Sequence, residues 1–405
     1  MTQTIDCTDL VHKKIKELPP LPLVIQKLTE VMENPSSSAD HVKEILSSDQ
    51  ALAGKVLKLV NSSFYGLSGE VSTISRAVVI LGFSAVRNLA TGLGVVKLMG
   101  KPSTDQIVKD FWRHSVSTGA AAYVLAQHTD YADPEEAFIA GLLHDLGGLI
   151  LILAVPKEYQ EVMDLGPDNM IENEQKLLGI THARVGQKVL KHWKLPKNLC
   201  DAVRYHHTPK IFNGKEDPLV SIVALADTLS CAHGMLYERS LTNEDFPKLI
   251  QVTGLDVSEV GDILKEMDDR VCATRNLLKL GDEIMIQQTT SGQETPRSVV
   301  LLCTSPTQAT WGQQILNHYG HNLIPMKKFF SSPDEHEEVD LVLVDPESVS
   351  AEQLAKMKPV LEKFSGKIAV LGEDPEDVVR DVLGHAVRSI PLAFSRCDLE
   401  NQDSG

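Results

Sequence analysis

The most apolar segment of the chain is Ala137-Phe-Ile-Ala-Gly-Leu-Leu-His-Asp-Leu-Gly-Gly-Leu-Ile-Leu-Ile-Leu-Ala154. Two polar side chains, His144 and Asp145, lie at its centre and a pair of glycines follows them. Burying an unpaired carboxylate and imidazole there would cost on the order of several kcal/mol, so both must pair with other groups or bind a ligand. A membrane span would rarely carry such a pair, so the segment predicts a buried core helix. Gly147 and Gly148 permit close packing or a break just past the pair.

Other segments with helical spacing carry side chains of the same two kinds. Helices expected from Thr181, Lys197 and Pro218 would present further histidines and a carboxylate. The candidate ligands are His114, His144, Asp145, His182, His206, His207 and Asp227. Imidazole and carboxylate without thiolate suit a divalent ion such as iron, manganese or zinc. The alternative is a metal-free polar network in which the buried groups pair with one another.

Composition limits the other classes of function. The chain has 405 residues, of which 42% are hydrophobic and 23% charged, as in ordinary globular proteins. Its net charge of -16 argues against binding along a nucleic-acid backbone, which needs a basic face. The six cysteines form no CxxC pair, and the N-terminus lacks the pattern of a signal peptide. We therefore expect a cytoplasmic protein with free thiols, no membrane partner and no nucleic-acid partner.

The hydrophobic period divides the chain into four regions. Residues 1–100 and 101–285 read as helical, and the second region carries every candidate ligand. Residues 286–296 are a polar linker, after which residues 297–395 alternate short apolar runs with helical stretches. The runs are Ser298–Cys303, Asp340–Val344 and Lys367–Leu371, and the helical stretches are Thr307–Tyr319, Ala351–Phe364 and Pro375–His385. This order predicts an all-α region followed by a small doubly wound α/β domain.

Four separated motifs occur along the helical region. They are Leu18-Pro-Pro-Leu-Pro22, Leu59-Val-Asn-Ser-Ser-Phe-Tyr-Gly66, Ala77-Val-Val-Ile-Leu-Gly82 and Gly141-Leu-Leu-His-Asp-Leu-Gly147. Their identity and order resemble the HDOD domain, the HD-related output domain of bacterial signalling proteins, over roughly residues 10–225. The resemblance implies an all-α fold and a role as an output or interaction module that contacts a signalling partner.

The candidate ligands also resemble a wider pattern. His114, His144-Asp145 and Asp227 are similar to the H…HD…D set of the HD superfamily of metal-dependent phosphohydrolases. His182, His206 and His207 match the added histidines of its binuclear members, including the HD-GYP enzymes, in which the motif's aspartate, here Asp145, bridges two ions. Asp110 resembles an additional acidic ligand of HD-GYP proteins. The resemblance implies two divalent ions and a second function, hydrolysis of a nucleotide or cyclic dinucleotide.

Two departures separate this chain from the HD-GYP enzymes. Gly148 stands where those enzymes carry a lysine, and the segment after His207 does not resemble the GYP motif. Hydrolysis of cyclic di-GMP therefore does not follow from the resemblance, and the sequence assigns no catalytic residue and no organic cofactor. The output module and the phosphohydrolase remain two open interpretations.

The C-terminal region resembles a receiver or flavodoxin-like domain. Asp345 ends an apolar run, where receivers carry their phosphorylated aspartate. The first run ends in Cys303-Thr304 instead of an acidic pair, while Gly372 and Ile390 replace the hydroxyl residue and the lysine. Without the acidic pair, Mg²⁺ has little to hold it. We predict a degenerate receiver-like module that is not phosphorylated and acts by contact, with Asp345 as an ordinary strand-end residue.

Overall fold

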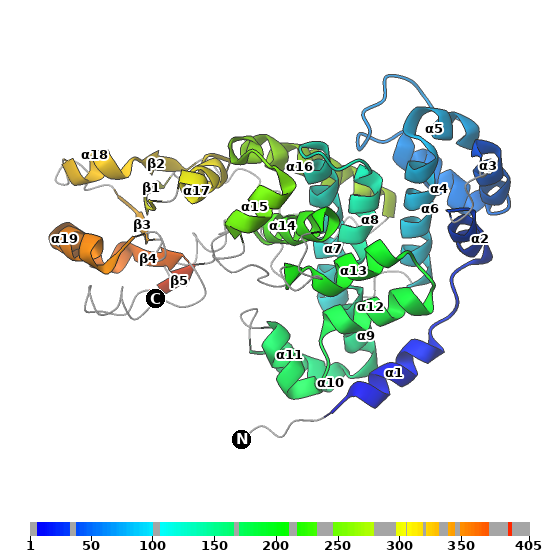
Figure 1. Ribbon diagram of the computed structural model, residues 1–405, viewed down its shortest axis with the longest axis horizontal. Coiled ribbons are helices and arrows are strands. Elements are labelled where there is room, and N and C mark those ends of the chain that lie inside the picture. The colour runs from blue at the N-terminus through cyan, green and yellow to red at the C-terminus, as the bar shows by residue number, and fades with distance from the viewer. Residues whose placement is uncertain are drawn as a thin grey trace. The chain divides into compact units, whose positions relative to one another are not determined.

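The computed structural model describes residues 6–32, 38–99, 106–165, 170–209, 217–232, 246–278, 297–304, 306–318, 321–331, 339–344, 349–371 and 388–390. The chain divides into two compact units (Figure 1). The first contains Met1–Ser230 and Glu266–Met285, and the second contains Leu241–Lys265 and Ile286–Gly405. The segments expected as 1–100 and 101–285 thus share one unit for most of their length, while Leu241–Lys265 groups with the C-terminal region.

The first unit is built from helices. Their bounds are α1 Thr8–Glu17, α2 Leu23–Met32, α3 Ala39–Ser47, α4 Gln50–Val60, α5 Ile74–Leu81, α6 Phe83–Leu98, α7 Gln106–Gln127, α8 Pro134–Leu143, α9 Leu146–Ala154, α10 Pro156–Met163, α11 Met170–Leu178, α12 His182–His192, α13 Lys197–Tyr205 and α14 Pro218–Ala232. The long helix α16, Val260–Leu278, contributes its C-terminal part. This observation confirms the expected helical region.

The apolar segment forms two helices instead of one. α8 begins where the Asp133 carboxylate accepts a hydrogen bond from the Glu136 amide at 3.0 Å, with Pro134 at the first position. It ends at Leu143, and α9 starts at Leu146. The break therefore falls at His144-Asp145 itself and not past the pair. Pro134–Ala154 is long and apolar enough to cross a membrane, but 83% of its most apolar window is buried inside the protein.

Close packing fixes α9 against α12. A Cβ atom on Gly147 would lie 1.9 Å from the carbonyl oxygen of His182, so only glycine fits there. α8 approaches α7 in the same way, since a Cβ atom on Gly141 would lie 2.6 Å from the carbonyl oxygen of Thr118. These glycines bring the His144-Asp145 break close to two neighbouring helices.

The Asn-Ser-Ser-Phe-Tyr-Gly turn after α4 joins the N-terminal helices to this core. The Phe64 ring packs against the rings of Tyr123 and Phe138, with centroids 4.7 and 5.3 Å away. The Tyr65 hydroxyl donates a hydrogen bond to the buried carboxylate of Glu135 at 3.1 Å. The motif therefore contacts α7 and α8, the helices that lead to the break.

The second unit contains a five-stranded parallel sheet of order β2-β1-β3-β4-β5. The strands are β1 Ser298–Leu302, β2 Asn322–Ile324, β3 Leu341–Val344, β4 Ile368–Leu371 and β5 Arg388–Ile390. The helical elements are α15 Phe246–Thr253, η2 Val257–Glu259, α17 Pro306–His318, α18 Met326–Ser331, α19 Ala351–Leu361 and η4 Glu362–Lys367. The apolar runs expected as parallel strands are β1, β3 and β4. Asp345, Gly372 and the helix expected at Pro375–His385 lie outside the described residues.

Candidate metal centre

The structure gathers all seven candidate ligands in the first unit. His114 lies in α7, His144 and Asp145 lie between α8 and α9, and His182 is the first residue of α12. His206 and His207 follow α13, and Asp227 lies in α14. They form two groups whose ligand atoms lie within 4.8 Å of one another: His114, His144 and Asp227, and Asp145, His182, His206 and His207.

The first group is compact and buried. His114 Nε2 lies 2.9 Å from Asp227 Oδ1 and 3.1 Å from His144 Nε2, and His144 Nε2 lies 3.5 Å from Asp227 Oδ1. All three side chains are at most 1% exposed. Three ligand atoms of the HD pattern therefore face a common point.

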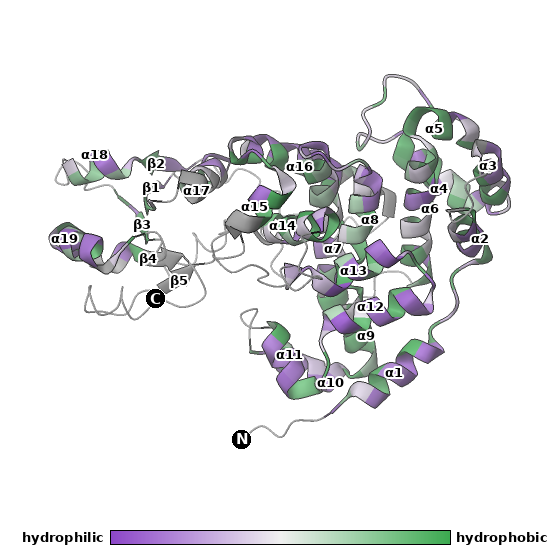
Figure 2. Ribbon diagram, viewed as in Figure 1, coloured by the Kyte–Doolittle hydropathy of each residue, from purple (hydrophilic) through white to green (hydrophobic). Residues whose placement is uncertain are grey.

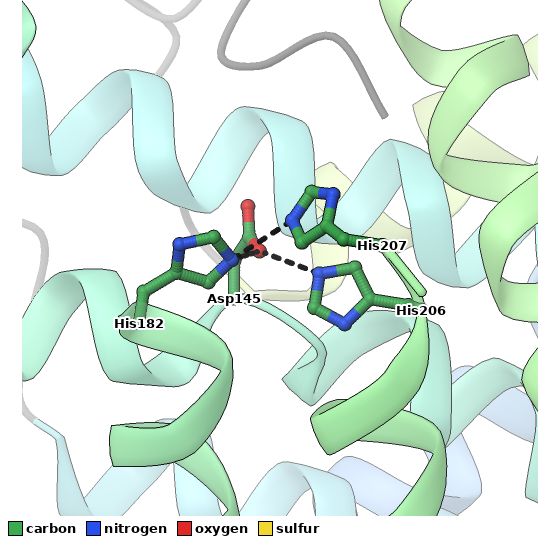
Figure 3. A group of neighbouring side chains, drawn as sticks. All are labelled: Asp145, His182, His206 and His207. Atoms are coloured by element: carbon green, nitrogen blue, oxygen red, sulfur yellow. Dashed lines mark hydrogen bonds and ion pairs between the residues drawn. The ribbon is translucent and has the colours of Figure 1, made fainter. Parts of the chain in front are cut away.

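The second group surrounds the other side of Asp145. Figure 3 shows the imidazoles of three histidines turned toward the Asp145 carboxylate. His182 Nε2 and His206 Nε2 lie 3.4 and 3.5 Å from Asp145 Oδ1, and His182 Nε2 lies 2.9 Å from His207 Nε2. His207 is half-buried, whereas the other members are buried.

Asp145 connects the two groups through different oxygens. Oδ2 lies 3.3 Å from His144 Nε2 and 3.5 Å from His114 Nε2, whereas Oδ1 faces His182 and His206. Ligand atoms about 2.1 Å from one ion stand roughly 3.0–3.4 Å apart, which matches these separations. Both Asp145 oxygens and His206 Nε2 are buried without a hydrogen-bond partner among the described residues. The donor set therefore fits divalent metal, with one ligand group on each side of Asp145.

Hydrogen bonds behind the histidines turn their Nε2 atoms toward the centre. His144 Nδ1 lies 2.7 Å from the Gly141 carbonyl oxygen, and His206 Nδ1 lies 2.9 Å from that of Val203. A carbonyl oxygen only accepts, so each Nδ1 carries the proton and each Nε2 is left to bind a metal.

Glu174 performs the same task for His182 and was not predicted from the sequence. Its carboxylate lies 2.9 Å from His182 Nδ1 and accepts the His182 backbone N–H at 2.7 Å. It is fully buried, although α11 is drawn largely in the colour of hydrophilic residues in Figure 2. Carboxylate–histidine pairs of this kind hold the tautomer and ring orientation of metal ligands.

The charges of the centre perturb its pKa values strongly. Burial raises the pKa of Asp145, but the neighbouring histidines, His144 first and then His206 and His182, together hold it well below its ordinary value. Burial lowers the pKa of His144, but Asp145 and Asp227 raise it to about 10, so without a metal Nε2 also carries a proton, which a bound ion would displace. Burial and the neighbouring histidines keep the pKa of His207 well below its ordinary value. A neutral His207 can bind a metal at neutral pH.

Asp110 does not join either group. Its carboxylate pairs with Arg113 at 3.1 Å, one turn along the same helix. It is therefore not among the residues that the structure brings together as ligands. Of the other histidines, His12 contacts Lys188, and His128 lies 3.4 Å from Glu266.

A pocket of about 540 Å³ opens beside the second group. His207, a member of the second group, and Thr181, which directly precedes His182, both line it. Volumes of this size are typical of sites for small molecules.

Comparison with known proteins agrees with this architecture. Over 230 residues the chain is 29% identical to an uncharacterized protein of Treponema pallidum (strain Nichols), covering 56% of this chain and 44% of that protein. The chain thus matches less than half the length of that curated relative.

Solved structures share the helical fold. A candidate phosphohydrolase from Shewanella amazonensis SB2B has 27% identity and a TM-score of 0.54, covering 66% of this chain and 98% of that chain. An HDOD-domain protein of unknown function from Geobacter sulfurreducens has 24% identity and a TM-score of 0.51, and the match covers 65% of this chain and 97% of that chain. The sequence profile of the HDOD domain matches residues 18–209. Residues 18–209 of the chain, slightly less than half of its length, thus match the HDOD domain.

Proposed function

We propose that the HDOD region is a metal-dependent phosphohydrolase with a binuclear centre, acting within a signalling protein. One observation carries the proposal: the two oxygens of Asp145 face two separate ligand groups at 3.3–3.5 Å. Two bound divalent ions would acidify water and offset the negative charge of a phosphoester. Iron, manganese and zinc suit the imidazole and carboxylate donors.

Residues of the chain orient the metal-binding imidazoles and control how a ligand reaches them. Glu174 and the carbonyl oxygens of Gly141 and Val203 orient three imidazoles, which limits the rearrangement needed for binding. The buried surround excludes bulk water from the first group, whereas His207 borders the pocket. A ligand that enters the pocket therefore meets the second group, and we propose a nucleotide or cyclic dinucleotide as its class.

Elemental analysis tests the metal centre. Protein purified without added metal should contain two ions per chain, and Asp145→Ala should lose both because this side chain faces both groups. His192→Ala is the matched control, since His192 is an exposed histidine on α12 outside both groups. Less than one ion per chain in the native protein, or an unchanged content in Asp145→Ala, would contradict the proposal.

A phosphoesterase assay tests the chemistry separately. The metal-loaded full chain should hydrolyse bis(p-nitrophenyl) phosphate, and chelation or Asp145→Ala should abolish the activity while His192→Ala keeps it. A metal-loaded protein that hydrolyses neither this compound nor a panel of nucleotides and cyclic dinucleotides would refute the phosphohydrolase and retain the metal centre.

The output module is the second candidate, and Gly148 favours it. The HD-GYP enzymes carry a lysine at this place, whereas this chain has a buried glycine. In that case the metal centre would be structural or sensory, and the region would act on a signalling partner by contact. Full metal content, no hydrolysis and a large loss of stability on chelation would support this function.

We also propose that the sheet unit is a degenerate, doubly wound receiver-like domain that acts by contact in the cytoplasm. Its strand order β2-β1-β3-β4-β5 is the flavodoxin-like order, which supports the proposal. β1 is followed by Cys303-Thr304, which offers no acidic pair for Mg²⁺.

A further inference from the structure

The pocket beside His207 is cationic, in contrast to the chain as a whole. Lys176, Arg184 and Arg204 line it, and Glu172 is its one acidic lining residue among the described part of the chain. The 405-residue sequence carries a net charge of -16, so a local excess of positive charge is not a consequence of composition. Such an excess in a concave site attracts anionic ligands.

The two arginines are not neutralised by neighbouring acids. Within the described residues, no carboxylate forms an ion pair with either Arg184 or Arg204. The Arg204 guanidinium instead lies 5.1 Å from the centroid of the Tyr205 ring, within the range of a cation–π contact. Both guanidinium groups line the same pocket, so a bound dianion would offset their mutual repulsion.

The start of α12 adds to the positive potential. Thr181 caps this helix by accepting a hydrogen bond from the Arg184 amide, and Thr181, Ala183 and Arg184 all line the pocket. The first turn of a helix carries partial positive charge and favours phosphate. The helix end, the two guanidinium groups and a half-buried histidine of the metal centre thus border one cavity.

We propose that Arg184 and Arg204 bind a phosphate group of a small phosphorylated ligand that enters this pocket. The inference deepens the proposed function and rests on it for the metal ions beside the ligand. Two planar guanidinium groups match the geometry and double charge of phosphate better than those of a single carboxylate. The pocket volume of about 540 Å³ suits a small molecule and not a macromolecule.

A purely structural role for Arg204 makes a different prediction. Arg204 is a basic residue in the last turn of α13, where a cation offsets the helix dipole. If that were its whole role, its replacement would lower the melting temperature and leave phosphate affinity unchanged. Affinity and stability must therefore be measured on the same variants.

Calorimetric titration of the metal-loaded full chain with inorganic phosphate provides the test. Arg184→Gln and Arg204→Met, which retains an apolar stem, should each weaken phosphate binding about tenfold or more. Glu172→Gln should strengthen binding, because it removes a negative charge from the same wall. Lys191→Gln is the control, since Lys191 is an exposed cation on α12 that does not line the pocket.

Metal content, measured in parallel, separates this inference from the proposed function. The arginine variants should keep their metal. Asp145→Ala should bind phosphate more weakly than the native protein, and the double variant Asp145→Ala/Arg184→Gln should bind it more weakly still. Arginine-dependent binding in a native protein without metal would refute the metal centre and support the phosphate pocket. Full metal content with phosphate affinity unchanged in both arginine variants would overturn the pocket and leave the metal centre standing.

Discussion

The seven residues that the sequence singles out lie in two adjoining groups. Glu174, which orients His182, could not be predicted from the sequence. His144, Asp145 and Asp227 could be singled out because they are polar side chains in apolar segments, whereas His182, His206 and His207 were singled out by their resemblance to the binuclear HD pattern. Glu174 belongs to a polar helix, α11, whose sequence resembles any solvent-facing helix. Its burial arises only when α11 packs so that this carboxylate contacts His182, and that contact is tertiary.

Glu174→Gln tests whether this contact orients His182. An amide cannot supply the negative charge that favours an Nδ1–H donor, so metal affinity of the second group should fall about 10–100-fold. Competition with a chromophoric chelator measures the affinity of each ion. Glu161→Gln, at an exposed position of α10, should change nothing. Equal affinities in Glu174→Gln and the native protein would show that His182 needs no such support.

At the scale of elements, the sequence predicted helices and strands well where one physical signal dominates. β1, β3 and β4 are continuous apolar runs, as buried parallel strands are. β2, Asn322–Ile324, has three residues and no buried one, so no run marks it. The glycines after His144-Asp145 were expected to permit either close packing or a break; Gly147 serves close packing against α12, and the break falls at the pair itself.

Gly147→Ala should therefore disturb the contact between α9 and α12. The added Cβ would meet the His182 carbonyl oxygen at 1.9 Å, so the two helices must separate, at a cost of about 1–3 kcal/mol or more. Urea unfolding should show the loss, and metal content should fall because His182 moves. Gly54→Ala, in α4 with open space around it, should instead be neutral or stabilising by up to about 1 kcal/mol. Native stability in Gly147→Ala would mean that the helices have room to separate.

Tyr65 gives a pH-dependent prediction for the contact between the Asn-Ser-Ser-Phe-Tyr-Gly turn and α8. Burial raises the pKa of Glu135, and the hydrogen bond from Tyr65 lowers it in part. A raised carboxyl pKa favours folding at acidic pH, and this contribution is lost as the pH rises through the folded pKa. Tyr65→Phe removes the donor, so it should destabilise by about 1–3 kcal/mol at pH 7.5 and by less at pH 4.5. Urea unfolding at both pH values measures the difference, and an equal loss at both would contradict the role of the Glu135 charge.

At the scale of the whole molecule, all seven candidate ligands lie in the first unit. They come from α7, the α8–α9 break, α12, the end of α13 and α14, so bound ions would connect most helices of the first unit. The second unit contributes none of them. The assignment of α15 and η2 to that second unit could not be predicted, because their helical period is the same in either unit.

Chelation should consequently destabilise the two units unequally. Ligands that bind only the folded state add about 2.7 kcal/mol when present at a hundred times their Kd, and removing the ions also leaves buried carboxylates and crowded imidazoles without a cation. Calorimetry of the full chain should show one transition shifting down by several degrees after chelation and a second transition, from the sheet unit, staying in place. The Asp145→Ala protein should give the lower transition with and without chelator, since it has no ions to lose. A chelated native protein that melts as before, with its metal loss confirmed by elemental analysis, would show that the ions are bound without supporting the fold.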